Sequence, residues 1–126
     1  KYSSEAAFVE VTFDSKSNSF AEKTNRLLSI VQTIADKKNK LTALAETGYE
    51  AIPQANWWTD ILLKAIGSNK ISYVLVWRNH GYSEYKKKMH YYAPYRGQTS
   101  AADFQKFYQH KKTFFEKDAE KEDLYK

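Results

Sequence analysis

The sequence has no cysteine and only two prolines and four glycines among its 126 residues. Without cysteine there is no disulfide framework, no thiolate metal site and no cysteine nucleophile, and nothing indicates a redox compartment. The longest apolar runs have about six residues, far short of the ~20 that cross a bilayer, so we expect no membrane partner. The first residues, Lys1, Tyr2 and Ser3, do not form a signal peptide.

Apolar and aromatic side chains, in contrast, are plentiful, at 42% and 16% of the chain. This composition excludes a disordered chain and predicts a folded core. The length suits one domain or part of one, whereas a complete eight-stranded α/β barrel needs about twice as many residues. The net charge of +5 comes mainly from lysine clusters that we expect on the surface. These lysines are Lys37, Lys38, Lys40, Lys86, Lys87, Lys88, Lys111 and Lys112.

The first third of the chain predicts a strand, a helix and a second strand. Apolar and polar residues alternate over residues 5–13, which is typical of a strand. Apolar residues at helical spacing predict a helix from about Phe20 to Lys38, with Ser19 as its N-cap and Asn39 at its end. The unbroken apolar run 41–45 predicts a strand that is covered on both faces, as in a parallel sheet.

The middle of the chain repeats this order. Residues 48–56 predict a loop, residues 57–66 a helix closed by Gly67, and residues 71–77 a second strand. A helix between two apolar strands is the pattern of a parallel α/β sheet.

The last third predicts a long tyrosine-rich loop at residues 78–98 and a helix that begins near Ala101. Thr99 or Ser100 is the expected cap of this helix. The charged tail, residues 116–126, is expected to fray.

Polar residues at the ends of the two apolar strands indicate a site. Glu46 directly follows the run 41–45, and Trp77 and Arg78 close the second strand. A buried carboxylate is costly, so its position calls for a partner or a chemical role. The loops that leave the two strands are long and the loops that enter them are short, and parallel α/β folds hold their sites at the C-terminal ends of strands.

Six motifs occur together: Leu44-Ala45-Glu46-Thr47-Gly48, Ile52-Pro53, Trp57-Trp58, Tyr73-Val74-Leu75-Val76-Trp77-Arg78-Asn79, His90-Tyr91-Tyr92-Ala93-Pro94-Tyr95 and Ser100-Ala101-Ala102-Asp103-Phe104. In order and spacing they resemble the C-terminal part of the β-mannanases of glycoside hydrolase family 26. The resemblance covers about residues 20–115, whereas residues 1–19 match the family poorly.

Members of that family are (β/α)8 barrels that cleave internal β-1,4-mannosidic bonds with retention. The resemblance therefore implies an α/β fold in which residues 1–126 form one partial (β/α)8 barrel, about the last three βα units. An N-terminal barrel complement or self-association would cover the open strand edges. It also implies a secreted or periplasmic protein that acts on β-mannan or manno-oligosaccharides and needs no cofactor.

The resemblance also assigns roles to residues. Glu46 matches the catalytic nucleophile, and Trp77 matches the aromatic floor under the sugar at the cleavage point. Arg78 and His90 match contacts to the next sugar. The family's acid/base glutamate follows a histidine, but no histidine here precedes a glutamate. We therefore expect a fragment of a retaining endo-β-1,4-mannanase that supplies the nucleophile and the sugar platform but is inactive alone.

Other interpretations remain open. The chain fits a non-catalytic or engineered self-associating half-barrel scaffold, or a carbohydrate-binding module. The lysines of residues 86–88 among tyrosines would also suit single-stranded nucleic acid, although a solvated loop is the simpler explanation and we expect no nucleic-acid partner. Taken alone, Glu46 fits a capping carboxylate and His90 a structural histidine, and the histidine spacing is not a metal pattern. Arg78 has Glu46 and Asp60 as candidate ion-pair partners.

Overall fold

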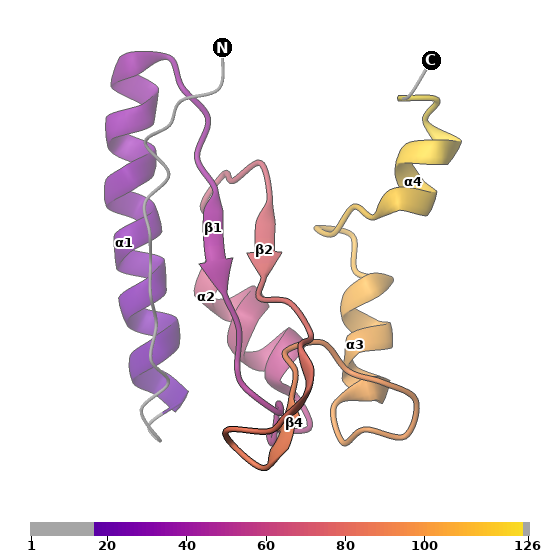
Figure 1. Cartoon of the computed structure of the whole chain (residues 1–126). Coiled ribbons are helices and arrows are strands. Elements are labelled where there is room, and N and C mark those ends of the chain that lie inside the picture. The colour runs from indigo at the N-terminus through magenta and orange to yellow at the C-terminus, as the bar shows by residue number, and fades with distance from the viewer. Residues whose placement is uncertain (1–16, 125–126) are drawn as a thin grey trace.

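The computed structural model describes residues 17–124 (Figure 1). The strand predicted at residues 5–13 lies outside these residues. The elements follow the order α1 (Ser17–Lys38), β1 (Leu44–Thr47), η1 (Trp57–Leu63), α2 (Lys64–Ile66), β2 (Val74–Val76), β3 (Gly81–Ser83), β4 (Lys88–His90), α3 (Ala101–Tyr108) and α4 (Glu116–Lys121). Strands β1 and β2 pair in parallel, and β3 and β4 pair antiparallel. Both sheets are open, so the described residues form a small mixed α/β structure and not a closed barrel.

Helix α1 confirms the predicted helix and its C-terminal end. Phe20, Thr24 and Leu28 recur every four residues and form its buried face. At the end, Asn39 adopts a φ of 51°, and the Lys40 N–H donates to the Ala35 carbonyl over 2.8 Å, as in a Schellman motif. The predicted N-cap is wrong, because α1 begins at Ser17 and Ser19 lies within it.

The predicted helix at residues 57–66 is also present, but its first part, η1, has the wider hydrogen bonding of a π-helix. Gly67 ends α2 with a φ of 58°, which confirms the predicted glycine stop. Trp58, only 1% exposed, packs edge-on against Trp57 and Phe104, with ring centroids 4.7 Å apart in each pair. This aromatic cluster joins η1 to α3.

Polar contacts fix α3 onto η1. The buried carboxylate of Asp103 accepts hydrogen bonds from the Thr59 backbone N–H at 3.0 Å and from the Thr59 hydroxyl at 2.6 Å. Ser100 precedes α3 as predicted, but its hydroxyl does not cap the helix. It accepts from Trp58 Nε1 at 3.0 Å and donates to Gln98 at 2.7 Å. These buried polar groups are therefore satisfied by one another.

Strand β1 starts later than predicted. Leu41 is 73% exposed and precedes the strand, whereas Leu44 is fully buried within it. As a result Glu46 lies inside β1 and not after it. Hydrogen bonds from Ser72 N to Thr42 O and from Trp77 N to Thr47 O, both 2.8 Å, extend the pairing of β1 with β2 at both ends.

The second face of β2 is not covered, contrary to the prediction for these strands. Leu75 is 45% exposed, whereas Val74 and Val76 pack against the core. In Figure 1, α1 and the α3–α4 segment lie on opposite sides of the β1–β2 pair. No described element packs over Leu75, because the described chain supplies one apolar layer and not two.

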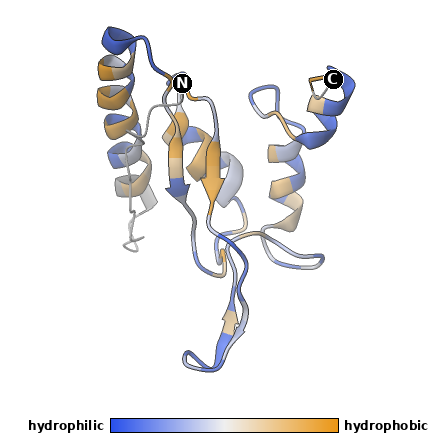
Figure 2. Cartoon of the chain, turned by 45° about the horizontal axis from the view of Figure 1, so that its top comes forward, coloured by the Kyte–Doolittle hydropathy of each residue, from blue (hydrophilic) through white to orange (hydrophobic). Residues whose placement is uncertain are grey.

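The region predicted as a loop at residues 78–98 contains the β3–β4 hairpin. Gly81, Tyr82 and Ser83 pair with His90, Met89 and Lys88 in register. Figure 2 shows this hairpin projecting away from the helices, with largely hydrophilic colouring. The sequence did not predict it because short polar strands lack the apolar alternation that marks a buried one.

The charged tail is more ordered than predicted. Residues 116–121 form α4, and the Asp118 carboxylate accepts a hydrogen bond from the Phe115 backbone N–H at 3.0 Å. Ala119 is buried. A cap and one buried contact therefore hold this turn. No helix in residues 17–124 is both long enough and apolar enough to span a membrane.

Candidate active site

An irregular register in β1 sets the direction of Glu46. Leu44 pairs with Val74 and Thr47 with Val76, so two residues of β1, Ala45 and Glu46, lie opposite Leu75. One extra residue in one strand of a pair is a β-bulge. If the same residues alternated strictly from Leu44, Glu46 would lie on the face of Leu44, toward the helices.

The bulge brings the two principal site residues to one face of the sheet. Leu44 and Thr47 are both buried and share the core face with Val74 and Val76. Leu75 points to the opposite face, and Trp77 follows it by alternation. Glu46 therefore shares the exposed face with Trp77, whose side chain is 41% accessible.

Arg78 does not pair with Glu46 or with Asp60. Its guanidinium lies 3.1 Å from Nδ1 of His80, two residues along the chain. Within residues 17–124 the Glu46 carboxylate has no hydrogen-bond or ion-pair partner, and its side chain is half-buried. A carboxylate without a partner is free to approach a bound molecule.

His90 lies in a cluster of polar and aromatic side chains at the base of the hairpin. Its Nε2 is 3.3 Å from the Tyr92 hydroxyl and 3.7 Å from Glu50 Oε1. Its ring packs edge-on against His80 and Tyr92, with centroid distances of 6.0 Å and 5.3 Å. Because Arg78 binds His80, the two predicted polar contacts, Arg78 and His90, belong to one connected group.

Glu50 and Tyr92 were not predicted as site residues. Burial raises the pKa of the Tyr92 phenol, and the carboxylates of Glu50 and Glu46 raise it further. Tyr92 thus lies within electrostatic range of the predicted nucleophile. A Cβ at Gly48 would lie 2.7 Å from the Tyr92 ring, so a larger residue there would displace the ring; this contact is visible only in the fold.

The Glu50 carboxyl is held ionised by the hairpin. Burial alone would raise its pKa, but the close ammonium of Lys88 and the charges of Lys86 and His90 lower the pKa below 4.5. A lowered pKa in the folded chain stabilises the ionised contact above pH 4.5. That stabilisation is lost as the pH falls through the folded-state pKa.

We therefore expect the β3–β4 hairpin to loosen at acid pH. The protection factors of the β3 and β4 amides, which compare observed with intrinsic exchange rates at each pH, should fall between pH 6 and about pH 3 as Glu50 takes up its proton. The Glu50→Gln variant should lack this step. An unchanged step in that variant would show that another group controls the hairpin.

Solved structures aligned with the chain are those of glycoside hydrolases, each at a TM-score of 0.70. A GH26 β-mannanase from Bacteroides ovatus is 42% identical over 81% of this chain and 28% of that chain. GH26C from a Muricauda species is 25% identical, and the alignment covers 83% of this chain and 28% of that chain. The catalytic domain of a Bacillus GH26 endo-β-1,4-mannanase is 26% identical, and the alignment covers 85% of this chain and 30% of that chain. No family model and no curated protein matches the chain.

The chain is part of a glycoside hydrolase family 26 domain. It spans less than a third of each of the solved structures named above. The predicted family is thereby confirmed, and the fold prediction is confirmed as a portion of a (β/α)8 domain.

This partial GH26 domain offers no metal site in its described part. Residues 17–124 contain no group of three histidine, aspartate or glutamate side chains placed to hold an ion. The exposed face of β1 and β2 presents the Glu46 carboxylate and the Trp77 indole ring.

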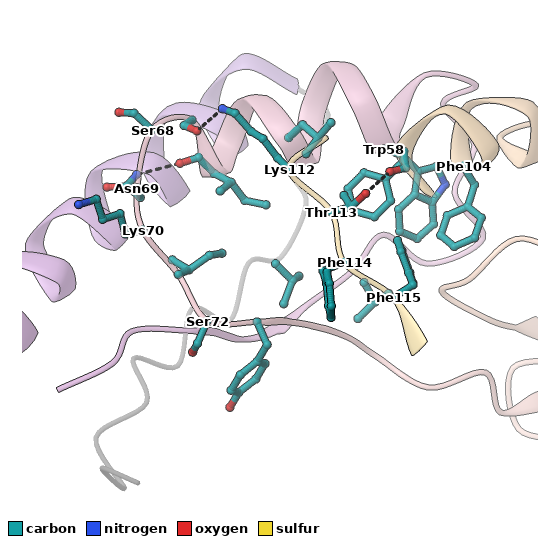
Figure 3. Close-up of a pocket in the computed structure, with 18 of the residues that line it drawn as sticks. Trp58, Ser68, Asn69, Lys70, Ser72, Phe104, Lys112, Thr113, Phe114 and Phe115 are labelled. Atoms are coloured by element: carbon teal, nitrogen blue, oxygen red, sulfur yellow. Dashed lines mark hydrogen bonds between the residues drawn. The ribbon is translucent and has the colours of Figure 1, made fainter. Parts of the chain in front are cut away.

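The partial GH26 domain also has a groove of about 950 Å³ between β2 and the α3–α4 segment (Figure 3). One wall is formed by residues 70–74 and Val76, and the other by Phe104, Phe107, Phe114 and Phe115. Lys112 lies toward one end, where its Nζ donates to the Gly67 carbonyl at 2.9 Å. None of the predicted site residues lines this groove, so it is separate from Glu46 and Trp77.

Proposed function

We propose that this chain is the part of a retaining endo-β-1,4-mannanase that supplies the nucleophile and the sugar platform. Glu46 attacks the anomeric carbon, and Trp77 lies under the sugar ring at the point of cleavage. The observation that carries the proposal is the bulge in β1, because it turns Glu46 to the face that exposes Trp77.

The two side chains suit this chemistry. An indole ring offers a flat apolar surface with a negative face, which complements the C–H edge of a pyranose. A carboxylate next to that platform can form the covalent glycosyl–enzyme intermediate of a retaining mechanism. Arg78 and His90, joined through His80, extend polar groups beyond the platform toward a neighbouring sugar.

The mechanism needs a second carboxyl group about 5 Å from the first, to give and take a proton. Within residues 17–124 the Glu46 carboxylate has no hydrogen-bond partner, and no histidine of the sequence precedes a glutamate. We infer that the proton donor comes from a barrel segment outside these 126 residues. The chain alone should therefore not cleave mannan.

An activity assay on two proteins tests the proposal. The isolated chain should release no reducing ends from β-mannan. A chimera in which the chain replaces the aligned segment of the Bacteroides ovatus β-mannanase should hydrolyse mannan with retention. Retaining turnover by the isolated chain above that of its Glu46→Gln variant would contradict the incomplete site. A folded but inactive chimera would contradict the role of the chain.

A self-associating scaffold is the second candidate. The observation that favours it is the row Tyr73, Leu75 and Trp77, about half exposed along one face of β2. Open strand edges and uncovered apolar faces favour association with a second copy. Sedimentation of the isolated chain distinguishes the two: a stable homodimer that does not bind manno-oligosaccharides favours the scaffold, and a monomer that binds them favours the glycosidase part.

A further inference from the structure

The β3–β4 hairpin carries His90 but adds little to the core. All its residues are exposed or only half-buried. One backbone hydrogen bond ties the chain after it to the β1–η1 loop, from Ala51 N to Tyr91 O at 2.8 Å. The Asn79 side chain accepts from the backbone of Tyr92 and Ala93, which closes the base of the hairpin on itself. The direction of the hairpin therefore depends on few contacts with the rest of the molecule.

Glu50 supplies the main charged contact between the β1–η1 loop and this hairpin. Its Oε1 is 3.2 Å from Lys88 Nζ and 3.7 Å from His90 Nε2, and its Oε2 is 3.6 Å from Lys86 Nζ. Oε1 has almost no contact with solvent. One carboxylate thus faces three side-chain nitrogens of residues 86–90, a stretch of five residues that ends the hairpin.

This arrangement differs from an ordinary surface ion pair. The Lys87–Glu84 pair in the same hairpin, at 3.0 Å, joins two side chains that are 74% and 80% exposed. Such pairs contribute little because solvent screens them. The Glu50 side chain is 27% exposed and lies against two lysine ammonium groups and the His90 ring, so its loss removes three contacts at once.

The Glu50 contact also fixes the direction of the His90 ring. Nε2 faces Glu50 Oε1 and the Tyr92 hydroxyl, and within residues 17–124 Nδ1 has no hydrogen-bond partner. A histidine with one nitrogen engaged by the protein presents the other in a defined orientation. Nδ1 is thus the nitrogen available to a bound molecule.

We propose that Glu50 is a positioning residue that holds the hairpin and the His90 ring so that Nδ1 of His90 meets a hydroxyl of the sugar next to the one on Trp77. The inference rests on the proposed function, because it names how that sugar-binding site is held. Glu50 does not touch the sugar. It acts through His90, and through Lys86 and Lys88 on the hairpin.

Matched variants of the full chain test this role. Glu50→Gln keeps the shape of the side chain and removes its charge, and Glu84→Gln makes the same change at an exposed pair of the same hairpin. We expect Glu50→Gln to weaken mannotetraose binding about tenfold. A displaced His90 ring would lose the hydrogen-bond geometry between its Nδ1 and the sugar hydroxyl. Glu84→Gln should bind as the unmodified chain does. Calorimetry gives both affinities.

A second measurement separates positioning from general loss of structure. Ring resonances of His90 and Tyr92, observed by NMR without sugar, should shift in Glu50→Gln and not in Glu84→Gln, while the melting temperature stays close to that of the unmodified chain. Lys88→Gln removes the ammonium group that lies closest to Glu50 and should cause the same ring shifts and the same loss of affinity. This variant provides the test if Glu50→Gln does not fold.

Each outcome decides one idea. If the unmodified chain binds mannotetraose and Glu50→Gln binds it equally well, the positioning role is wrong and the proposed function stands. If the unmodified chain does not bind mannotetraose, the proposed sugar platform is wrong, and the role of Glu50 at it is wrong as well. Ring shifts of equal size in Glu84→Gln would also overturn the positioning role.

Discussion

Replacement of Glu46 by alanine in the chimera should reduce mannan hydrolysis by on the order of 10³-fold or more, as expected when a nucleophile that acts with other catalytic groups is removed. The loss should appear in kcat, because the carboxylate forms its bond to the anomeric carbon only in the chemical step. Initial rates of reducing-end release give the ratio. Glu22→Gln, an exposed carboxylate of α1, is the matched control and should leave the rate unchanged.

Azide makes this test specific for a nucleophile. The cavity left by Glu46→Ala admits the small anion, which attacks an activated aryl β-mannobioside at the anomeric carbon and expels the aryl alcohol as its anion. The product is the α-mannobiosyl azide, formed by a single displacement with inversion. Failure to form this product, together with full activity of Glu46→Ala, would show that Glu46 is not the nucleophile.

Replacement of Trp58 by alanine should lower the free energy of unfolding by about 3–5 kcal/mol, the range for large aromatic residues in cores. Trp58 is buried, contacts Trp57, Phe104 and Phe107, and donates its Nε1–H to Ser100. The variant would leave a cavity between η1 and α3 and remove one hydrogen bond of a buried hydroxyl. Urea unfolding followed by circular dichroism measures the loss.

Trp77→Ala is the control for this change, because it removes the same side chain from an exposed position. It should alter the free energy of unfolding by less than about 1 kcal/mol, since exposed substitutions have small effects. Equal losses for the two variants would mean that the Trp58 cluster does not hold η1 against α3.

Helix α1 and the η1–α2 segment were predictable because their signals are local. Apolar residues at helical spacing define α1 and the η1–α2 segment. These two segments end at Asn39 and Gly67, and both residues adopt a positive φ. Strands β1 and β2 were predicted in the right order but with shifted bounds, whereas β3 and β4 were not predicted. Leu41 is apolar and exposed, because the pairing with β2 begins after it and not at the start of the apolar run.

Glu46, Trp77 and Arg78 were predicted as site residues from their positions at strand ends, and their roles stay predictions. Contacts between residues far apart in the sequence gave no such signal. Glu50 was missed because its partners, Lys86 and Lys88, lie far along the chain and look like ordinary surface lysines. Neither candidate ion-pair partner of Arg78, Glu46 or Asp60, pairs with it, because His80 lies next to the guanidinium in the fold.

The bulge in β1 has a consequence for protein engineering and for sequence comparison. The direction of Glu46 is set by its place opposite Leu75, one position before Thr47, and not by the chemistry of the glutamate. Deletion of Ala45 would restore strict alternation, with Leu44 and Thr47 on the core face and Glu46 alone opposite Leu75, so the carboxylate would keep its face. A homologous strand that lacks the residue before the glutamate would therefore present the carboxylate on the same face without a bulge, and a one-residue gap at this point in an alignment does not argue against the site.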